Sequence, residues 1–248
     1  MLLTLGEVIS DAAKNGEGFP ILMVSLILLT YAVLIFVCLP FHEFAHAFAA
    51  TRLGDATSKW HGRLSLNPMK HLDVMGTIMM LVCGFGYAKP VPVNSYNFRN
   101  PKRGMALTAF AGPLSNLLLA VVAVAAFRLV LLFSGVEMMD VNGRMMLYGE
   151  RAEIVKYAHL LLVNVFASVN LSLAVFNLLP VPPLDGSRIF AVILPDRFVY
   201  VMERYQMYIS FALMMILLTT NVLDGPLYFL RQGFGFVICT LLGMPNVF

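Results

Sequence analysis

Long apolar runs separated by short polar segments dominate the chain. Residues 21–39 are almost wholly apolar, and similar runs cover 105–133 and 157–179. A helix needs about 20 apolar residues to cross the hydrocarbon of a bilayer. The pattern predicts an all-α polytopic membrane protein whose first helix covers about 20–53 and stops near Gly54. The runs at 105–133 and 157–179 are the second and third predicted spans.

The C-terminal part is apolar in two further runs. Residues 198–223 predict a fourth span. Residues 226–244 predict a fifth, weaker one, because Arg231 and several glycines interrupt it. The expected total is about four to five transmembrane helices.

Residues 55–103 have a different character. Residues 63–67 alternate polar and apolar side chains as a strand does. Residues 74–86 are apolar but cover only about two-thirds of a span, which indicates a re-entrant or interfacial segment. Residues 88–93 contain two prolines and are expected to be extended. A re-entrant, strand-like segment therefore joins the first two spans.

Composition agrees with membrane insertion. Hydrophobic residues make up 59% of the 248 residues and charged residues only 12%, against about a quarter in soluble domains. The formal net charge of +3 is too small to indicate nucleic acid. The three cysteines are far apart and predict no disulfide framework. We expect one membrane-embedded domain over 1–248, with an interfacial lead-in over 1–19 and C-terminal helices over 198–248.

Loop charge predicts the orientation. Residues 51–104 carry eight basic and two acidic residues, a net +6, whereas 134–156 have a net −1 and 1–19 a net −2. Positive loops face the cytoplasm, so the segment between the first two spans is expected on that side. Pro40, which should bend the first helix or loosen its hydrogen bonding, would then lie near the cytoplasmic face.

The end of the first predicted span carries the motif His-Glu-x-x-His. His42 and His46 are four residues apart, so on a helix they lie on the same face and can bind one metal ion. Glu43 lies beside them, where it can take a proton from a water on the metal. Ionisable residues in a span are costly and usually functional. The motif therefore predicts a zinc centre.

A hydrolytic zinc site usually has three protein ligands. Asp185 follows a proline-rich turn after the third predicted span, on the same side of the membrane as the histidines, and is the best third ligand. Cys38 is one turn before His42 but about 12 Å of helix from His46, and we interpret it as a packed thiol. His159 lies near the opposite end of its span. His61 and His71 are interpreted as solvated, although a fold-back would bring either near.

Some asparagines lie within predicted spans. Asn116, Asn170 and Asn177 can all form interhelical hydrogen bonds. Asn177 is about two turns before Asp185 and is also a candidate donor to a developing oxyanion.

These motifs together resemble the site-2 protease family of intramembrane zinc metalloproteases. The resemblance covers roughly 41–189, the expected catalytic core, and rests on the His42–His46 motif, the Gly112-Pro113-Leu114-Ser115-Asn116 sequence, and the segments 177–180 and 184–186. The segments 62–68 and 86–93 are similar to its compact bacterial branch. The linker 134–156 is too short for the PDZ domain that many relatives contain.

The resemblance implies one Zn²⁺ bound by His42, His46 and Asp185. It further implies Glu43 as general base, Asn177 as an oxyanion-side donor, and a supporting role for Asn116. The expected substrate is a transmembrane protein in the bacterial cytoplasmic membrane, cut within or beside its helix near the cytoplasmic face. The alternative is a metal-binding membrane protein without hydrolytic activity, such as a transporter or a pseudoprotease. Transport would place ionisable residues through the midplane of several spans, whereas here they gather at one end.

Overall fold

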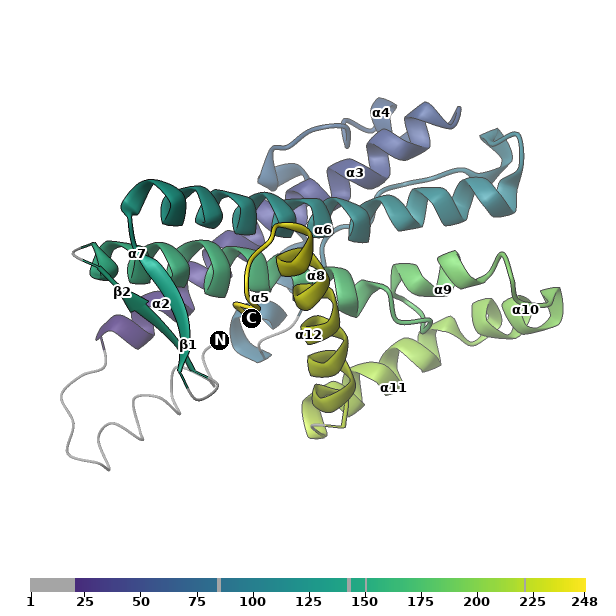
Figure 1. The fold of residues 1–248 in the computed structure, drawn as a ribbon. Helices are drawn as coiled ribbons and strands as arrows, with labels where there is room; N and C mark the ends of the chain where they lie inside the picture. The colour runs from purple at the N-terminus through teal and green to yellow at the C-terminus, as the bar shows by residue number, and fades with distance from the viewer. Residues whose placement is uncertain (1–20, 84–85, 142–143, 150, 221) are drawn as a thin grey trace.

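The computed structural model describes residues 21–83, 86–141, 144–149, 151–220 and 222–248 (Figure 1). The regular elements among the described residues are helices, apart from one two-stranded hairpin. The elements in chain order are α2 (Ile21–Val33), η1 (Leu34–Cys38), α3 (Leu39–Arg52), α4 (Thr57–Trp60), η2 (Pro68–Lys70), α5 (Val74–Cys83), η3 (Ser95–Asn97), α6 (Pro101–Ser134), β1 (Glu137–Val141), β2 (Arg144–Tyr148), α7 (Ala152–Ala158), η4 (His159–Ala167), α8 (Ser168–Asn177), α9 (Asp185–Phe190), α10 (Asp196–Arg204), α11 (Gln206–Thr219) and α12 (Asp224–Leu241). The predicted lead-in over 1–19 lies outside these residues.

Three helical stretches are long and apolar enough to cross a membrane: Val24–Arg52, Pro101–Ser134 and Val155–Asn177. They agree with the three best-defined spans predicted from the hydropathy pattern. The chain is therefore an integral membrane protein. A shorter apolar helix covers Gln206–Leu217.

The first long helix is continuous but irregular. α2 passes through the five π-helical residues of η1 into α3. The irregularity ends two residues before Pro40, which has no N–H to donate to the preceding turn, so the predicted loosening of the helix is confirmed. Gly54 ends the helix with φ of +110°, a conformation that favours glycine.

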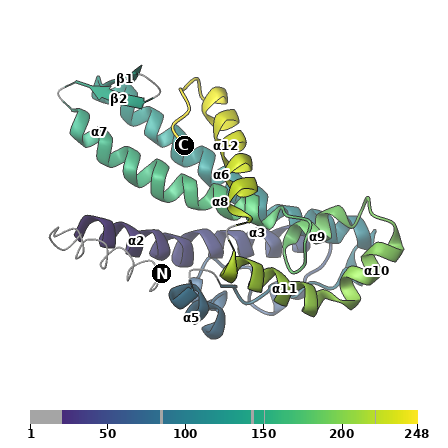
Figure 2. The ribbon, with the colours of Figure 1, turned by 90° about the horizontal axis from the view of Figure 1, so that it is seen from below.

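α6 is the central helix. It packs against α3 on one side and against η4 and α8 on another (Figures 1 and 2). Small side chains let these helices approach closely, because membrane helices associate through van der Waals packing rather than a hydrophobic driving force. Ala120 and Ala167 are fully buried at this contact, beside Phe127 and Leu171.

The C-terminal helices differ from the prediction. The residues of the predicted fourth span form two helices, because the chain leaves helical geometry at Tyr205. α10 has charged residues at both ends and none of its residues is buried, so only α11 is apolar throughout. α12 matches the position of the predicted fifth span, but it is not among the three stretches that meet the criteria for a span.

The segment between α3 and α6 folds back on itself. Residues 63–67 do not form the predicted strand; they form turns and bends around His71. His71, interpreted from sequence as solvated, is fully buried, and its Nε2 lies 2.6 Å from the Ser65 carbonyl oxygen. The Arg63 guanidinium donates to the carbonyl of Lys70. These buried side chains form hydrogen bonds with backbone carbonyls, so the segment does not depend on a strand ladder to satisfy them.

α5 has only 10 residues, which is too short to cross a bilayer. The chain returns antiparallel to the segment before α5, through a bridge between Leu72 and Ala88. This return needs a glycine at position 76, where a Cβ would lie 2.0 Å from the Tyr87 carbonyl oxygen.

A buried carboxylate joins the end of α3 to the approach to α6. Asp55 is fully buried and accepts hydrogen bonds from the Thr57 hydroxyl (2.5 Å), the Asn97 side chain (2.7 Å) and the Asn94 N–H (2.7 Å). Burial by itself raises the pKa of this carboxyl, but the hydrogen bonds outweigh it and hold the pKa below its ordinary value.

The link between α6 and α7 contains an antiparallel hairpin that hydropathy did not predict. β1 and β2 pair from Glu137 with Tyr148 to Val141 with Arg144. The hairpin lies at one end of the helices, and α9 and α10 lie at the other (Figures 1 and 2).

Candidate metal centre

The two histidines of α3 converge as their spacing predicts. Their Nε2 atoms are 3.1 Å apart, and the rings meet edge to face at 88°. Both side chains are buried, with exposed fractions of 5% for His42 and 11% for His46.

Asp185 completes a triangle with them. Its Oδ2 lies 3.1 Å from the Nε2 of His42 and 3.3 Å from that of His46. The carboxylate begins α9, which packs against α6. Gly186 lets the turn pass close to the end of α8, because a Cβ there would lie 2.2 Å from the Leu179 carbonyl oxygen. The structure thus places the predicted third ligand 143 residues from His42 in sequence and within hydrogen-bond distance in space.

One stripe of α6 packs against the two histidines and contacts their Nδ1 atoms. The Nδ1 of His46 lies 2.7 Å from the Thr108 carbonyl oxygen, to which it donates. The Nδ1 of His42 lies 3.3 Å from the Asn116 Oδ1 and donates to it in the same way. Pro113 has no N–H to donate to the Ala109 carbonyl, one turn earlier. The helical hydrogen bonding is therefore interrupted at the residue next to Thr108. With both Nδ1 atoms protonated, both Nε2 lone pairs are free for a metal.

Gly112 lies between Thr108 and Asn116 on this stripe. A Cβ built on Gly112 would lie 2.4 Å from the Nε2 of His46 and 2.7 Å from the Cε1 of His42. Any side chain here would occupy the place of the imidazoles. Glycine is therefore what allows α6 to approach the two histidines this closely.

The donor set fits zinc. Two ligands of a tetrahedral zinc, each about 2.0–2.1 Å from the ion, lie about 3.3 Å apart. The three separations here are 3.1, 3.1 and 3.3 Å. Two imidazoles and one carboxylate leave a fourth position free, as in catalytic zinc sites. His42, His46 and Asp185 are the one such cluster found within the described part of the chain.

Electrostatics also favour an ionised Asp185. Burial by itself raises the pKa of its carboxyl. When the imidazoles are protonated at both nitrogens, the charge of His46 and hydrogen bonds from both imidazoles outweigh burial, and the net pKa lies below its ordinary range. A bound cation would also lower the pKa of the Asp185 carboxyl.

The other predicted site residues have different surroundings. Glu43 is half-buried beside His42, and its carboxylate makes no hydrogen bond within the residues that the structure describes. Asn116 is fully buried and contacts His42, as given above. Asn177 donates to the Leu173 carbonyl of its own helix at 2.9 Å. The structure therefore brings Asn116 to the triad, and within the described residues no hydrogen bond joins Asn177 to it.

The alternative ligands do not reach the triad. Cys38 is fully buried, as expected of a packed thiol. His159 lies 3.3 Å from the Val247 carbonyl oxygen, and His61 is exposed and contacts the Thr57 carbonyl. Sequence reasoning missed the Thr108 carbonyl and the steric role of Gly112. The spacing 108, 112, 116 was the available signal, since it places all three on one helix face.

Comparison with known proteins supports the site. Residues 30–219 match the model of Peptidase family M50. The chain is 43% identical over 171 residues to "Putative zinc metalloprotease YwhC" of Bacillus subtilis, which covers 68% of this chain and 72% of that protein. It is 33% identical over 159 residues to "Putative zinc metalloprotease Rip2" of Mycobacterium tuberculosis, covering 62% of this chain and 52% of the relative. No solved structure matches the chain.

The matched region thus spans about half the length of Rip2. Residues 30–219, which match the family model, contain the His42 and His46 motif, the supporting stripe of α6 and Asp185. The chain belongs to peptidase family M50, the site-2 protease family of zinc metalloproteases, and His42, His46 and Asp185 are its zinc-binding group.

Proposed function

We propose that this protein hydrolyses a peptide bond within or beside a transmembrane helix of a membrane-protein substrate, near the cytoplasmic face of a bacterial membrane. The convergence of His42, His46 and Asp185 beside membrane-length helices supports the proposal, because a metal centre with an open position there has access to a peptide bond of a neighbouring membrane helix. The high positive charge of residues 51–104 supports the cytoplasmic side.

Zinc bound by the triad would polarise the scissile carbonyl and make water a better nucleophile at neutral pH. Glu43 is the proton carrier: its half-buried carboxylate accepts a proton from the attacking water and returns it to the leaving amine nitrogen. Asn116 and the Thr108 carbonyl hold the imidazoles in the ligating tautomer.

Asn177 has a second amide N–H besides the one given to Leu173. In this proposal the second N–H donates to the oxyanion that develops from the scissile carbonyl.

A substrate helix must unwind locally, because its carbonyls are otherwise hydrogen-bonded. The extended residues 88–93 can receive the unwound segment by strand addition. Within the described chain, the N–H groups of Val91 and Val93 donate to no other residue. Since 63–67 is not a strand, the segment 88–93 carries this role alone.

The proposed architecture is one membrane-embedded domain with residues 41–189 as its catalytic core. α12 is about 27 Å long by its 18 residues, close to the hydrocarbon thickness. We infer that α12 and the shorter α11 also lie in the membrane, which brings the number of membrane helices to five.

The test is the substitution Glu43→Gln, assayed with a panel of epitope-tagged single-span membrane proteins co-expressed with the protein. We expect cleavage by the wild type and none by the variant, with zinc content unchanged in the purified protein because Glu43 is not a ligand. Glu203→Gln, on the exposed surface of α10, is the matched control and should cleave normally. Undiminished cleavage by Glu43→Gln would refute the proposal, and zinc binding without cleavage by the wild type would favour the non-hydrolytic alternative.

A further inference from the structure

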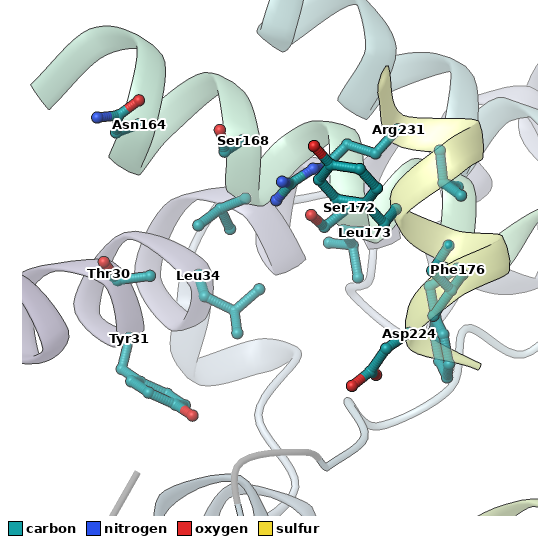
Figure 3. A pocket seen from close by; sticks show the side chains of 14 residues that line it. Thr30, Tyr31, Leu34, Asn164, Ser168, Ser172, Leu173, Phe176, Asp224 and Arg231 are labelled. Atoms are coloured by element: carbon teal, nitrogen blue, oxygen red, sulfur yellow. The ribbon is translucent and has the colours of Figure 1, made fainter. Parts of the chain in front are cut away.

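A groove among the described residues lies away from the metal centre. It has a volume of about 680 Å³ and lies between the first long helix, the η4–α8 helix and α12 (Figure 3). None of the zinc ligands lines it. Side chains from all three helices point into it, and we call it the α8–α12 groove; it includes Thr30, Leu34, Ser168, Ser172, Tyr228 and Arg231.

One wall of the groove is a stripe of polar side chains in a membrane span. Asn164, Ser168 and Ser172 are each four residues apart, so they lie on one face of the η4–α8 helix. Within the residues that the structure describes, none of the three makes a side-chain hydrogen bond. Asn164 and Ser172 are exposed. Hydrocarbon cannot satisfy these groups, whereas a polar side chain of another helix can.

The opposite wall carries a cation. Asp224, Tyr228 and Arg231 line the groove from α12 with the spacing of one helix face. The Arg231 guanidinium lies 5.6 Å from the centre of the Tyr228 ring, and its Nε is buried with no hydrogen-bond partner. Asp224 is seven residues away, about 10 Å along the helix, and lies in the first turn of α12, where the helix dipole favours an acid. Within the described chain, no carboxylate pairs with Arg231.

The groove runs along the same helices that carry the metal centre. Leu34 lines the groove, and His42 follows eight residues later, about 12 Å along the same helix. Phe176 lines it from α8, one residue before Asn177. A helix lying in the groove would therefore point its next turns toward the zinc ligands.

We propose that the α8–α12 groove holds the transmembrane helix of the substrate, and that Arg231 selects helices with an aspartate or glutamate facing it. The acid would lie in the part of the substrate that stays helical, on the side of the scissile bond away from the cytoplasm. Charge complementarity carries this assignment, because an arginine in a span pairs with an acid or with backbone carbonyls. Within the described residues Arg231 contacts the Tyr228 ring but forms no ion pair, and its Nε has no hydrogen-bond partner. The assignment of the helix as substrate rests on the proposed function.

The test measures binding separately from cleavage. The Glu43→Gln protein, with a photoreactive residue at Leu227 in the groove, is reconstituted in vesicles of phosphatidylethanolamine and phosphatidylglycerol. It is mixed with synthetic leucine–alanine helices of about 24 residues that carry one aspartate at successive positions. We expect cross-linking to peak at one position, about tenfold above the helix with asparagine there.

Variants at Arg231 decide the role of its charge. Arg231→Glu should remove the aspartate peak and give a lysine peak at the same position, and Arg231→Gln should show neither. Arg99→Glu, an equal charge reversal at an exposed residue outside the groove, should leave the aspartate peak unchanged. Unchanged zinc content of both Arg231 variants reports an intact fold.

A flat positional profile, or a peak that persists in Arg231→Glu, would overturn the inference even if the wild type cleaves its substrates. An aspartate peak with no cleavage by the wild type would instead refute the proteolytic function and leave the groove as a helix-binding site.

Discussion

Gly112 and His46 are in direct contact across the α3–α6 interface, so close that a methyl group on Gly112 would lie 2.4 Å from the metal-binding Nε2 of His46. The metal centre is therefore shaped by the backbone of α6 as well as by its ligands. A site that depends on this approach is sensitive to the smallest possible added side chain.

Gly112→Ala is expected to weaken zinc binding at least about tenfold, because the added Cβ must displace one imidazole or separate α3 from α6. Zinc affinity measured by chelator competition checks this. Gly233→Ala is the matched control, since a Cβ at Gly233 meets nothing within 4 Å. Equal affinities of Gly112→Ala and the wild type would show that the two helices can move apart without cost.

Asp185→Ala should reduce the zinc content of the purified protein to well below one ion per chain, because two histidines alone form an incomplete site. Metal analysis after dialysis is the measurement. Asp196→Ala removes an exposed carboxylate that pairs with Lys102 at 2.5 Å and should keep full occupancy. Unchanged stoichiometry in Asp185→Ala would remove Asp185 from the site.

Asn116 should act as a positioning residue through His42. Asn116→Leu removes the acceptor for the Nδ1–H of His42 and should weaken zinc binding about 10- to 100-fold. Asn116→Asp retains an acceptor and should restore most of that affinity. A loss of turnover in Asn116→Leu with zinc affinity unchanged would instead place Asn116 among the groups that contact substrate.

Asp55 should make folding stability depend on pH. Its folded pKa is lowered, so its contribution is fully present above the unfolded pKa of about 3.9 and is lost as the pH falls through the folded value. Asp55→Asn should cost about 1.5–3 kcal/mol at pH 7. Thermal unfolding in detergent should show the difference from the wild type shrinking toward pH 3.

Asp196→Asn, at an exposed position, should have a much smaller effect at pH 7. A penalty for Asp55→Asn that stays constant from pH 7 to pH 3 would show that the charge of Asp55 does not stabilise the fold.

Local pattern was sufficient wherever a feature depends on spacing along one helix. The three long helices follow from apolar run length, because hydrocarbon requires about 20 residues of satisfied backbone. The convergence of His42 and His46 follows from the four-residue repeat, and the irregularity at η1 from Pro40. Loop charge and helix order then placed Asp185 on the side of the histidines.

The same reasoning failed where another element decides the conformation. Residues 63–67 alternate as a strand does, yet no strand within the described residues pairs with them. Instead, the His71 side chain hydrogen-bonds to the Ser65 carbonyl, and the Arg63 side chain donates to the Lys70 carbonyl. Residues 198–223 are apolar enough to suggest one span, but Tyr205 separates α10 from α11.

By itself, then, the sequence determined the membrane class, the three long helices and the pairing of His42 with His46, because each depends on hydropathy or on helical spacing. Loop charge and helix order added Asp185 as the best third ligand. Only the tertiary structure decided that the Thr108 carbonyl and Asn116 orient the imidazoles and that Gly112 must lack a side chain. Only the tertiary structure, too, placed Arg231 across a groove from Asn164, Ser168 and Ser172. These relations join residues on different helices, and helix packing sets their distances, which no spacing along a single helix encodes.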